Sequence, residues 1–199
     1  MKPTTKSFKE NVRVALTDAQ LQRALAGLPT GLVANRAAAR ARLPEFEDLR
    51  EICRDIKDHT LAHLDLYLEE YERNATAAGA KVHWAATAAE AREVILKICR
   101  EVNAKIVTKG KSMITEEIGL NAELQAAGIE VVETDLGEYL IQIRGETPSH
   151  IIAPAIHLTQ DQVEADFRRL HTTLPKDRVL NEAAQLVGEA RQILREKFL

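Results

Sequence analysis

The fold is decided by residues 105–134, KIVTKGKSMITEEIGLNAELQAAGIEVVET, which alternate between two kinds of pattern. Residues 105–108 and 129–133 are short runs rich in Ile and Val, which strands prefer. Between them lies a helical stretch that Ser112 opens and Gly128 ends, two common boundary signals. A strand, a helix and a second strand in this order are typical of a βαβ unit. The sequence therefore predicts an α/β fold with a parallel sheet covered by helices.

The alternation extends to both sides of this segment. Residues 81–86 predict a preceding strand, and Thr87 with Glu90 three residues later predicts a capping box that opens a helix. The later expected elements are a strand at 151–153, a strand or helix at 139–143, and helices at 159–171 and from 177 onward. Because the pattern stops after a helix at Leu199, we expect the sheet to be incomplete within this chain.

The first 75 residues carry only helical patterns. Helices are expected over residues 8–25 and over a short Ala- and Arg-rich stretch that ends near Pro44. A long helix is expected over residues 45–74, where apolar side chains recur at helical spacing. These side chains are Leu49, Ile52, Ile56, Leu64, Tyr67 and Tyr71. We therefore predict a helical region at residues 1–75, whose stripe packs on another surface, and an α/β domain at 76–199.

Composition and charge narrow the class of protein. Hydrophobic residues make up 45% and charged residues 29% of the chain, proportions typical of a folded globular protein. A net charge of -3 gives no basis for predicting nucleic-acid binding. No apolar run reaches the roughly 18 residues of a membrane-spanning helix, and the first ten residues lack the apolar core of a secretory signal. We therefore expect a cytoplasmic protein without a membrane span.

The chain has only two cysteines, Cys53 and Cys99, and no Cys-x-x-Cys motif. An iron–sulfur cluster is usually held by four thiolates, so this chain by itself is not expected to bind one. Both cysteines lie in predicted helices, where we expect buried thiols. The chain also lacks the nucleophile elbow, the Walker loop and the Gly-x-Gly-x-x-Gly motif of common catalytic and nucleotide sites.

The loop between the two strands holds the first candidate site. Lys109, Lys111 and Ser112 lie between a predicted strand and a predicted helix, where ligands bind in open α/β sheets. The free N–H groups of the helix start and the two ammonium groups would attract a small carboxylate or phosphate. The alternative is that Ser112 only caps the helix and that the lysines are solvated.

Glu117 is the second candidate. On one continuous helix it falls inside an apolar arc that also contains Met113, Ile118 and Leu124. A carboxylate that faces a core needs a partner, because burial of an unpaired charge is costly. That partner is either an internal donor, such as a backbone N–H or a basic side chain, or a bound ligand or interface.

Further candidates follow the second predicted strand. Asp135 and Glu138 are acids near its carboxyl end, where paired acids can orient a hydroxyl, transfer protons or bind a metal. No second ligand set with metal spacing accompanies them, so no metal is expected in this chain. His150 and His157 flank the predicted strand at 151–153, and each either titrates or ligates near neutral pH or hydrogen-bonds to the backbone.

Four stretches of the chain resemble the iron–sulfur lactate-utilisation protein B family, which carries a LUD domain. They are residues 111–121 (KSMITEEIGLN), 132–139 (VETDLGEY), 148–157 (PSHIIAPAIH) and 190–199 (ARQILREKFL). The resemblance covers nearly the whole chain and is weakest before about residue 45. Because several motifs occur in the family's order and at its separations, the resemblance is more specific than any one motif.

The resemblance implies a fold, a role and a set of partners. The fold is a Rossmann-like three-layer sandwich similar to sugar-phosphate isomerase and CoA-transferase domains. The role is that of the amino-terminal portion of a subunit that oxidises L-lactate to pyruvate by electron transfer, with two other lactate-utilisation subunits, in the cytoplasm. Two [4Fe-4S] clusters are implied in a carboxy-terminal part beyond Leu199. An incomplete sheet also makes a homo-oligomer an expected possibility.

Three hypotheses for function remain open on the sequence alone. The first is the lactate-oxidising role, with a small-anion pocket around Lys111 and Ser112. The second is an isomerase or transferase of sugar phosphates or CoA esters, with Glu117 or Asp135 as the base. The third is a non-catalytic interaction module, in which the helical region at residues 1–75 binds a partner. The resemblance assigns no catalytic residue.

Overall fold

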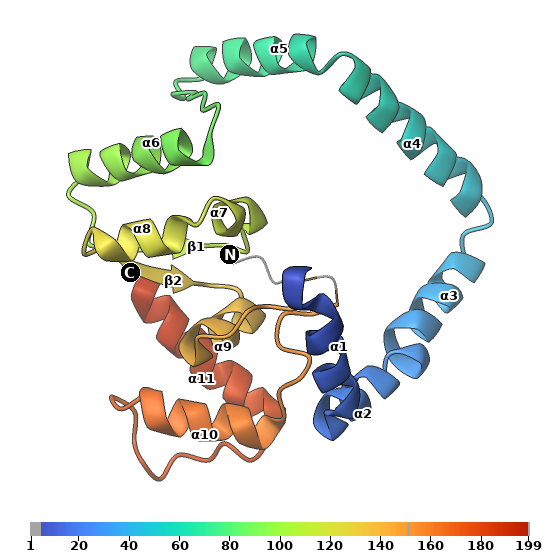
Figure 1. The fold of residues 1–199 in the computed structure, drawn as a ribbon, viewed down its shortest axis with the longest axis vertical. Helices are drawn as coiled ribbons and strands as arrows, with labels where there is room; N and C mark the ends of the chain where they lie inside the picture. The colour runs from blue at the N-terminus through green and yellow to red at the C-terminus, as the bar shows by residue number, and fades with distance from the viewer. Residues whose placement is uncertain (1–4, 151, 199) are drawn as a thin grey trace. The chain divides into compact units, whose positions relative to one another are not determined.

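A computed structural model describes residues 5–150 and 152–198 of the chain (Figure 1). Contacts divide the chain into two compact units. The first, called here the sheet unit, comprises Met1–Leu25 and Ala86–Leu199, and the second, the helical unit, comprises Ala26–Ala85. The elements are η1 (Thr5–Ser7), α1 (Phe8–Thr17), α2 (Ala19–Ala26), η2 (Pro29–Val33), α3 (Ala34–Ala41), α4 (Phe46–Ala62), α5 (Leu64–Ala77), α6 (Ala88–Glu101), β1 (Ile106–Lys109), α7 (Met113–Glu117), α8 (Leu120–Ala126), β2 (Glu130–Glu133), α9 (Leu136–Arg144), α10 (Gln160–Leu170) and α11 (Ala183–Phe198).

The predicted βαβ unit is confirmed as the centre of the sheet unit. β1 and β2 pair in parallel, from Ile106 opposite Glu130 to Lys109 opposite Glu133, and α7 and α8 connect them. In parallel strands the carboxyl ends lie at the same edge of the sheet. Lys109 and Glu133 therefore end neighbouring strands side by side, which positions the site described below.

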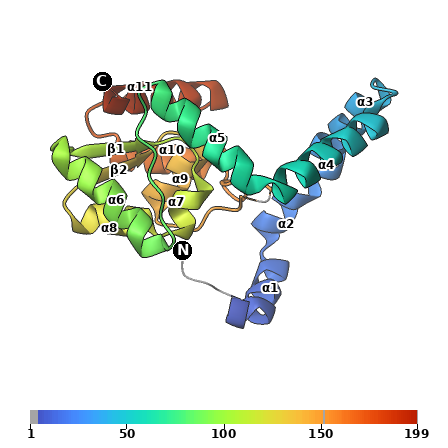
Figure 2. The same ribbon diagram turned by 90° about the horizontal axis from the view of Figure 1, so that it is seen from above.

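The sheet is covered on both faces, because successive side chains of a strand point in opposite directions. Val107 and Val131 belong to a core with α6 and α8, which includes the fully buried Leu124. Ile106 and Val132 face a second core with α9, α10 and α11. Figures 1 and 2 show these two groups of helices on opposite sides of β1 and β2. The predicted α/β class with helical layers around a parallel sheet is thus confirmed.

Most helix starts in the sheet unit follow local capping rules. Thr159 and Gln162 form a reciprocal capping box at the start of α10, and Ser112 accepts a hydrogen bond from the Thr115 N–H at the start of α7. Asp135 caps α9 by accepting hydrogen bonds from the N–H groups of Gly137 and Glu138. These side chains satisfy backbone donors that a helix start would leave unpaired, so local sequence sets the boundaries.

The structure corrects several predicted elements. Residues 81–85 form no strand, and in the predicted strand at 151–153 residue 151 lies outside the described residues while 152 and 153 form a turn and coil. The segment 139–143 lies within helix α9. The last helix begins at Ala183 rather than near 177. The sheet therefore contains two paired strands within the described part of the chain.

Three predicted helices are each divided into two. Asp18 separates α1 from α2, because its carboxylate accepts hydrogen bonds from Gln20 N and Leu21 N and starts a new helix. His63 separates α4 from α5 with non-helical backbone angles. Gly119 separates α7 from α8 with a φ of 70°, a left-handed conformation that glycine adopts without steric cost. The third division changes which face of the helix each residue occupies, with consequences for Glu117.

The helical unit, all of whose residues are described, has no buried residue in any of its helices α3, α4 and α5. The predicted apolar stripe is present, but its side chains are between 42% and 63% exposed. Cys53 on α4 is also exposed, so its predicted burial is wrong, whereas Cys99 on α6 is buried as expected. Among the described residues, no helix has the length and apolar character that crossing a membrane requires.

Candidate functional site

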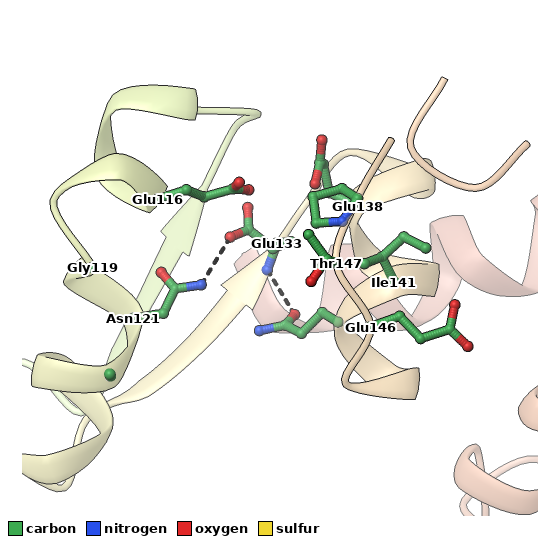
Figure 3. Close-up of a pocket in the computed structure, with 11 residues that line it drawn as sticks. Glu116, Gly119, Asn121, Glu133, Glu138, Ile141, Glu146 and Thr147 are labelled. Atoms are coloured by element: carbon green, nitrogen blue, oxygen red, sulfur yellow. Dashed lines mark hydrogen bonds between the residues drawn. The ribbon is translucent and has the colours of Figure 1, made fainter. Parts of the chain in front are cut away.

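The carboxyl ends of β1 and β2 open onto a cavity of about 280 Å³ (Figure 3). Its walls come from α7, α8, the end of β2, α9 and the segment after α9. The lining residues are Glu116, Gly119, Asn121, Ala122, Glu133, Glu138, Ile141, Gln142, Glu146, Thr147 and Pro148. Four of them are glutamates, so carboxylates line the cavity together with the polar side chains of Asn121, Gln142 and Thr147 and several apolar residues.

An ion pair between the two strand ends forms the floor of the cavity. Lys109 Nζ lies 2.5 Å from Glu133 Oε1, and both side chains are 5% exposed. The Lys109 ammonium also donates to Asn121 Oδ1 at 2.9 Å, while the Asn121 amide donates to Glu133 Oε1 at 3.2 Å. Three polar groups thus satisfy one another, which offsets the cost of burying two charges. Lys109 is a structural cation here and is not exposed to solvent.

A second polar cluster joins three separate segments above this floor. His150 Nε2 lies 2.6 Å from Glu138 Oε1 and 3.6 Å from Glu116 Oε1. The side chains of Glu138, His150 and Glu116 are 3%, 9% and 16% exposed. Figure 3 shows Glu116 on the α7 side and Glu138 on the α9 side of the cavity. Two carboxylates from different helices therefore converge on one imidazole.

Local turns position the members of this cluster. Asp135 starts α9 at the end of β2, so that Glu138 lies in the first helical turn and is buried. Backbone hydrogen bonds from Ser149 N to Pro154 O and from Ile152 N to Ser149 O fold the segment that carries His150 into a turn. Pro154 packs so closely on Gly137 that a Cβ there would lie 3.3 Å from it, which favours glycine at this contact. The turn is thus held against the start of α9.

Burial raises the pKa of Glu116 above its ordinary value. The nearby carboxylates of Glu138 and Glu133 also raise it, while His150 and Lys109 act in the opposite direction. A raised carboxyl pKa in a cavity with like charges is common at functional sites. Burial is thus the main cause of the raised pKa of Glu116, and the charges around it act in both directions.

The rim of the cavity holds a further ion-pair network. Arg144 Nε lies 2.7 Å from Glu146 Oε1, and its Nη1 lies 2.5 Å from Asp166 Oδ2. His157 Nε2 lies 2.6 Å from the other oxygen of Glu146. Burial alone would raise the pKa of Glu146, but hydrogen bonds from Arg144 and His157 outweigh burial and hold this pKa below its ordinary value. Glu146 is therefore a fixed anion beside the cavity mouth.

The structure brings together only some of the candidates that the sequence indicates. Lys109, Glu138 and His150 lie in or beside the cavity, and His157 reaches its rim through Glu146. Asp135 acts as the cap of α9. Lys111 is exposed with a φ of 52°, and Ser112 caps α7.

Glu117 is exposed, so its expected burial is wrong, and its neighbour Glu116 lines the cavity instead. Asn121 also lies in the cavity wall, and Glu133 ends β2 there. The end of a buried strand is the signal that could have singled out Glu133, since ligands bind at that edge.

The residues of this chain do not fit an iron–sulfur cluster. Cys53 lies on α4 in the helical unit and Cys99 on α6 in the sheet unit, and these are the chain's two cysteines. Because a [4Fe-4S] cluster requires four ligands that are usually thiolates, two isolated thiols cannot hold one. No chemical step at this site is therefore derived through a cluster.

Comparison with known proteins identifies a family whose model covers all the residues that line the cavity. A family model described as the LUD domain matches residues 68–199. Lactate utilization protein B of Macrococcus caseolyticus is 40% identical over 200 residues, which cover 100% of this chain and 41% of that protein. The proteins of the same name from Bacillus subtilis and Bacillus thuringiensis are 40% and 37% identical with the same coverage. The chain thus spans about two fifths of the length of these relatives. No solved structure matches it.

Proposed function

Because the chain belongs to the LUD domain family, we propose that it works in lactate utilisation and binds a small ligand in the cavity at the ends of β1 and β2. The supporting observation is that three separate stretches of the sequence meet at this cavity. The stretches 111–121, 132–139 and 148–157, which carry the family resemblance, contribute Glu116, Glu138 and His150 to one cluster. All of the lining residues lie within the matched segment 68–199.

The finer role proposed is that of one part of an iron–sulfur protein. In this role the parent protein oxidises L-lactate to pyruvate by electron transfer, together with two other lactate-utilisation subunits, in the cytoplasm. The clusters belong to residues outside this chain, because its two cysteines cannot hold one. The contribution of this chain is to bind and orient the small molecule, with the loop of Lys111 and Ser112 as a proposed contact for its carboxylate.

Ligand binding by this chain is tested by a thermal-shift titration. L-Lactate and pyruvate are expected to raise the melting temperature, because a ligand that binds only the native state stabilises it by mass action. At a ligand concentration of 100 times Kd the stabilisation is about 2.7 kcal/mol. Phosphate and a sugar phosphate serve as comparison ligands, since the isomerase alternative predicts the strongest shift with the latter.

Two variants locate the binding in this titration. Lys111→Ala tests the loop, and Asn121→Ala tests the cavity wall. Loss of the lactate shift in Asn121→Ala alone assigns the ligand to the cavity, and loss in Lys111→Ala assigns its carboxylate to the loop. Absence of a shift with every ligand in the wild-type chain would contradict ligand binding by this part of the protein.

A second candidate function is favoured by the exposed stripe of the helical unit. Ile52, Ile56 and Tyr71 are 53%, 59% and 63% exposed, although large apolar side chains at helical spacing are typical of packing surfaces. The interaction-module hypothesis predicts that α4 associates with another protein surface. Light scattering after gel filtration is then expected to give a mass above one chain, and Ile56→Asp is expected to restore one chain. A wild-type mass of one chain, both alone and with lactate-utilisation partner subunits, would count against this candidate.

A further inference from the structure

We propose that Glu116, Glu138 and His150 bind a divalent transition-metal ion at the cavity wall. One ligand atom from each residue lies within 4.8 Å of the other two. The three residues come from α7, α9 and the turn after α9, so they converge only in the folded protein. An imidazole with two carboxylates is a mixed nitrogen and oxygen ligand set that suits ions such as Mn²⁺, Fe²⁺ or Zn²⁺.

The distances within the cluster are close to those of a coordination sphere. In an octahedral coordination sphere with metal–ligand bonds of about 2.1 Å, neighbouring ligand atoms lie about 3 Å apart. His150 Nε2 is 2.6 Å from Glu138 Oε1 and 3.6 Å from Glu116 Oε1, on either side of that value. All three ligand atoms lie within 4.8 Å of one another, so side-chain rotations that shorten the longer distances would place them around one ion.

The charge balance of the cavity also favours a cation at this point. The Glu133 carboxylate is paired with Lys109, and Glu146 is paired with Arg144. Glu116 and Glu138 converge on the imidazole of His150, and 16% and 3% of their side chains are exposed. Two carboxylates held close together away from solvent repel one another. A divalent ion bound between them would offset this repulsion.

The cavity leaves room for further ligands on such an ion. Three protein ligands are typical of catalytic metal sites that keep open positions for water or substrate, whereas structural sites are closed by four. The cavity of about 280 Å³ is lined by Glu116 and Glu138, so open positions would face it. If the proposed function holds, the carboxylate and hydroxyl groups of a 2-hydroxy acid would chelate the ion. The bound ion would then allow an anionic substrate to enter a cavity that is lined with carboxylates.

Metal binding is tested on the whole 199-residue chain after removal of metal with a chelator. Titration with Mn²⁺, followed by the loss of the electron paramagnetic resonance signal of the free ion, is expected to give one bound ion per chain. Glu116→Gln, Glu138→Gln and His150→Gln are each expected to weaken binding at least tenfold. The matched control is Glu117→Gln, which removes an exposed carboxylate beside Glu116 and is expected to bind as the wild type does.

Melting temperatures without metal show whether each variant folds. Glu116 is the least buried ligand, so its variant keeps the test decisive if Glu138→Gln does not fold. No Mn²⁺ or Zn²⁺ binding, or equal binding in the three variants and the control, would overturn the proposal. If Mn²⁺ binds but L-lactate raises the melting temperature of neither the metal-free nor the Mn²⁺-bound protein, the metal site stands and the proposed ligand is wrong. If L-lactate binds equally with and without Mn²⁺, the proposed function stands and chelation by the ion is overturned.

Discussion

Replacing Lys109 with methionine is expected to destabilise the protein by about 3–5 kcal/mol, because it removes one partner of a buried ion pair. Glu133 would lose its ion-pair partner at a position where its side chain is 5% exposed, with Asn121 as its remaining polar contact on that oxygen. Methionine fills a similar volume, so the loss reflects the charge rather than an empty space. The measurement is the free energy of unfolding in urea, followed by circular dichroism.

Two further variants distinguish a buried pair from a surface pair. Lys105→Met changes an exposed lysine just before β1 and is expected to alter stability by no more than about 0.5 kcal/mol. Lys109→Met combined with Glu133→Leu removes both charges and is expected to be more stable than Lys109→Met alone, since no uncompensated charge remains. A loss below about 1 kcal/mol in Lys109→Met would show that the pair behaves as an exposed one.

The parts of the fold that depend on local sequence were predictable. The strand residues Val107 and Val131, the helix start at Ser112 and the helix start at residue 159 follow from patterns of a few residues, whereas β1 ends one residue later than predicted, at Lys109. Their physical causes are side-chain alternation and the pairing of free backbone donors, which act within one element. Placement of Lys109 at the carboxyl edge of the sheet also followed, because parallel strands end at one edge.

The error at Glu117 shows where periodicity fails. The apolar arc assumed one continuous helix after Ser112, but Gly119 adopts a φ of 70° and divides it into α7 and α8. Residues before and after such a break do not share a helical face. The burial of Leu120 and Leu124 on α8 therefore does not predict that the Glu117 side chain on α7 is buried. In the folded chain Glu116 faces the cavity and Glu117 faces solvent.

The predicted strand at residues 81–86 is wrong, because strand formation depends on long-range structure. A β-prone segment forms a strand only where a partner strand accepts its hydrogen bonds, and residues 81–85 pair with none in the described part of the chain. His150 meets Glu138 through a turn whose geometry no local pattern encodes. Sequence spacing therefore gave no reason to expect Glu116, Glu138 and His150 in one cluster.

Replacing Glu189 with glutamine is expected to be strongly destabilising at pH 7, and less so as the pH falls. Glu189 on α11 accepts two hydrogen bonds from Arg178, at 2.6 and 3.0 Å, and lies 2.7 Å from His171 Nδ1. Its side chain is 5% exposed, so the amide would leave the Arg178 charge buried without its carboxylate. The expected loss at pH 7 is about 3–5 kcal/mol.

The pH dependence follows from the direction of the pKa shift of Glu189. Burial alone would raise the pKa of Glu189, but hydrogen bonds from Arg178 and His171 outweigh burial and hold it below its ordinary value of 4.5. Between the folded pKa and 4.5 the unfolded chain binds more protons, so stability falls as the pH falls. The contribution of Glu189 is fully present above that window and is lost as the pH falls through the folded pKa.

The difference in stability between the wild type and Glu189→Gln is therefore expected to be constant from pH 6 to pH 4.5 and to shrink as urea unfolding is repeated at pH values below 4.5, toward the folded pKa. Glu196→Gln, on the exposed side of the same helix, is the matched control and is expected to change stability by about 0.5 kcal/mol or less at pH 6. A difference for Glu189→Gln that stays constant below pH 4.5 as well would mean that Arg178 and His171 do not hold the carboxylate in its charged form. The buried network would then stabilise α11 by packing alone, through neighbours such as the fully buried Phe167.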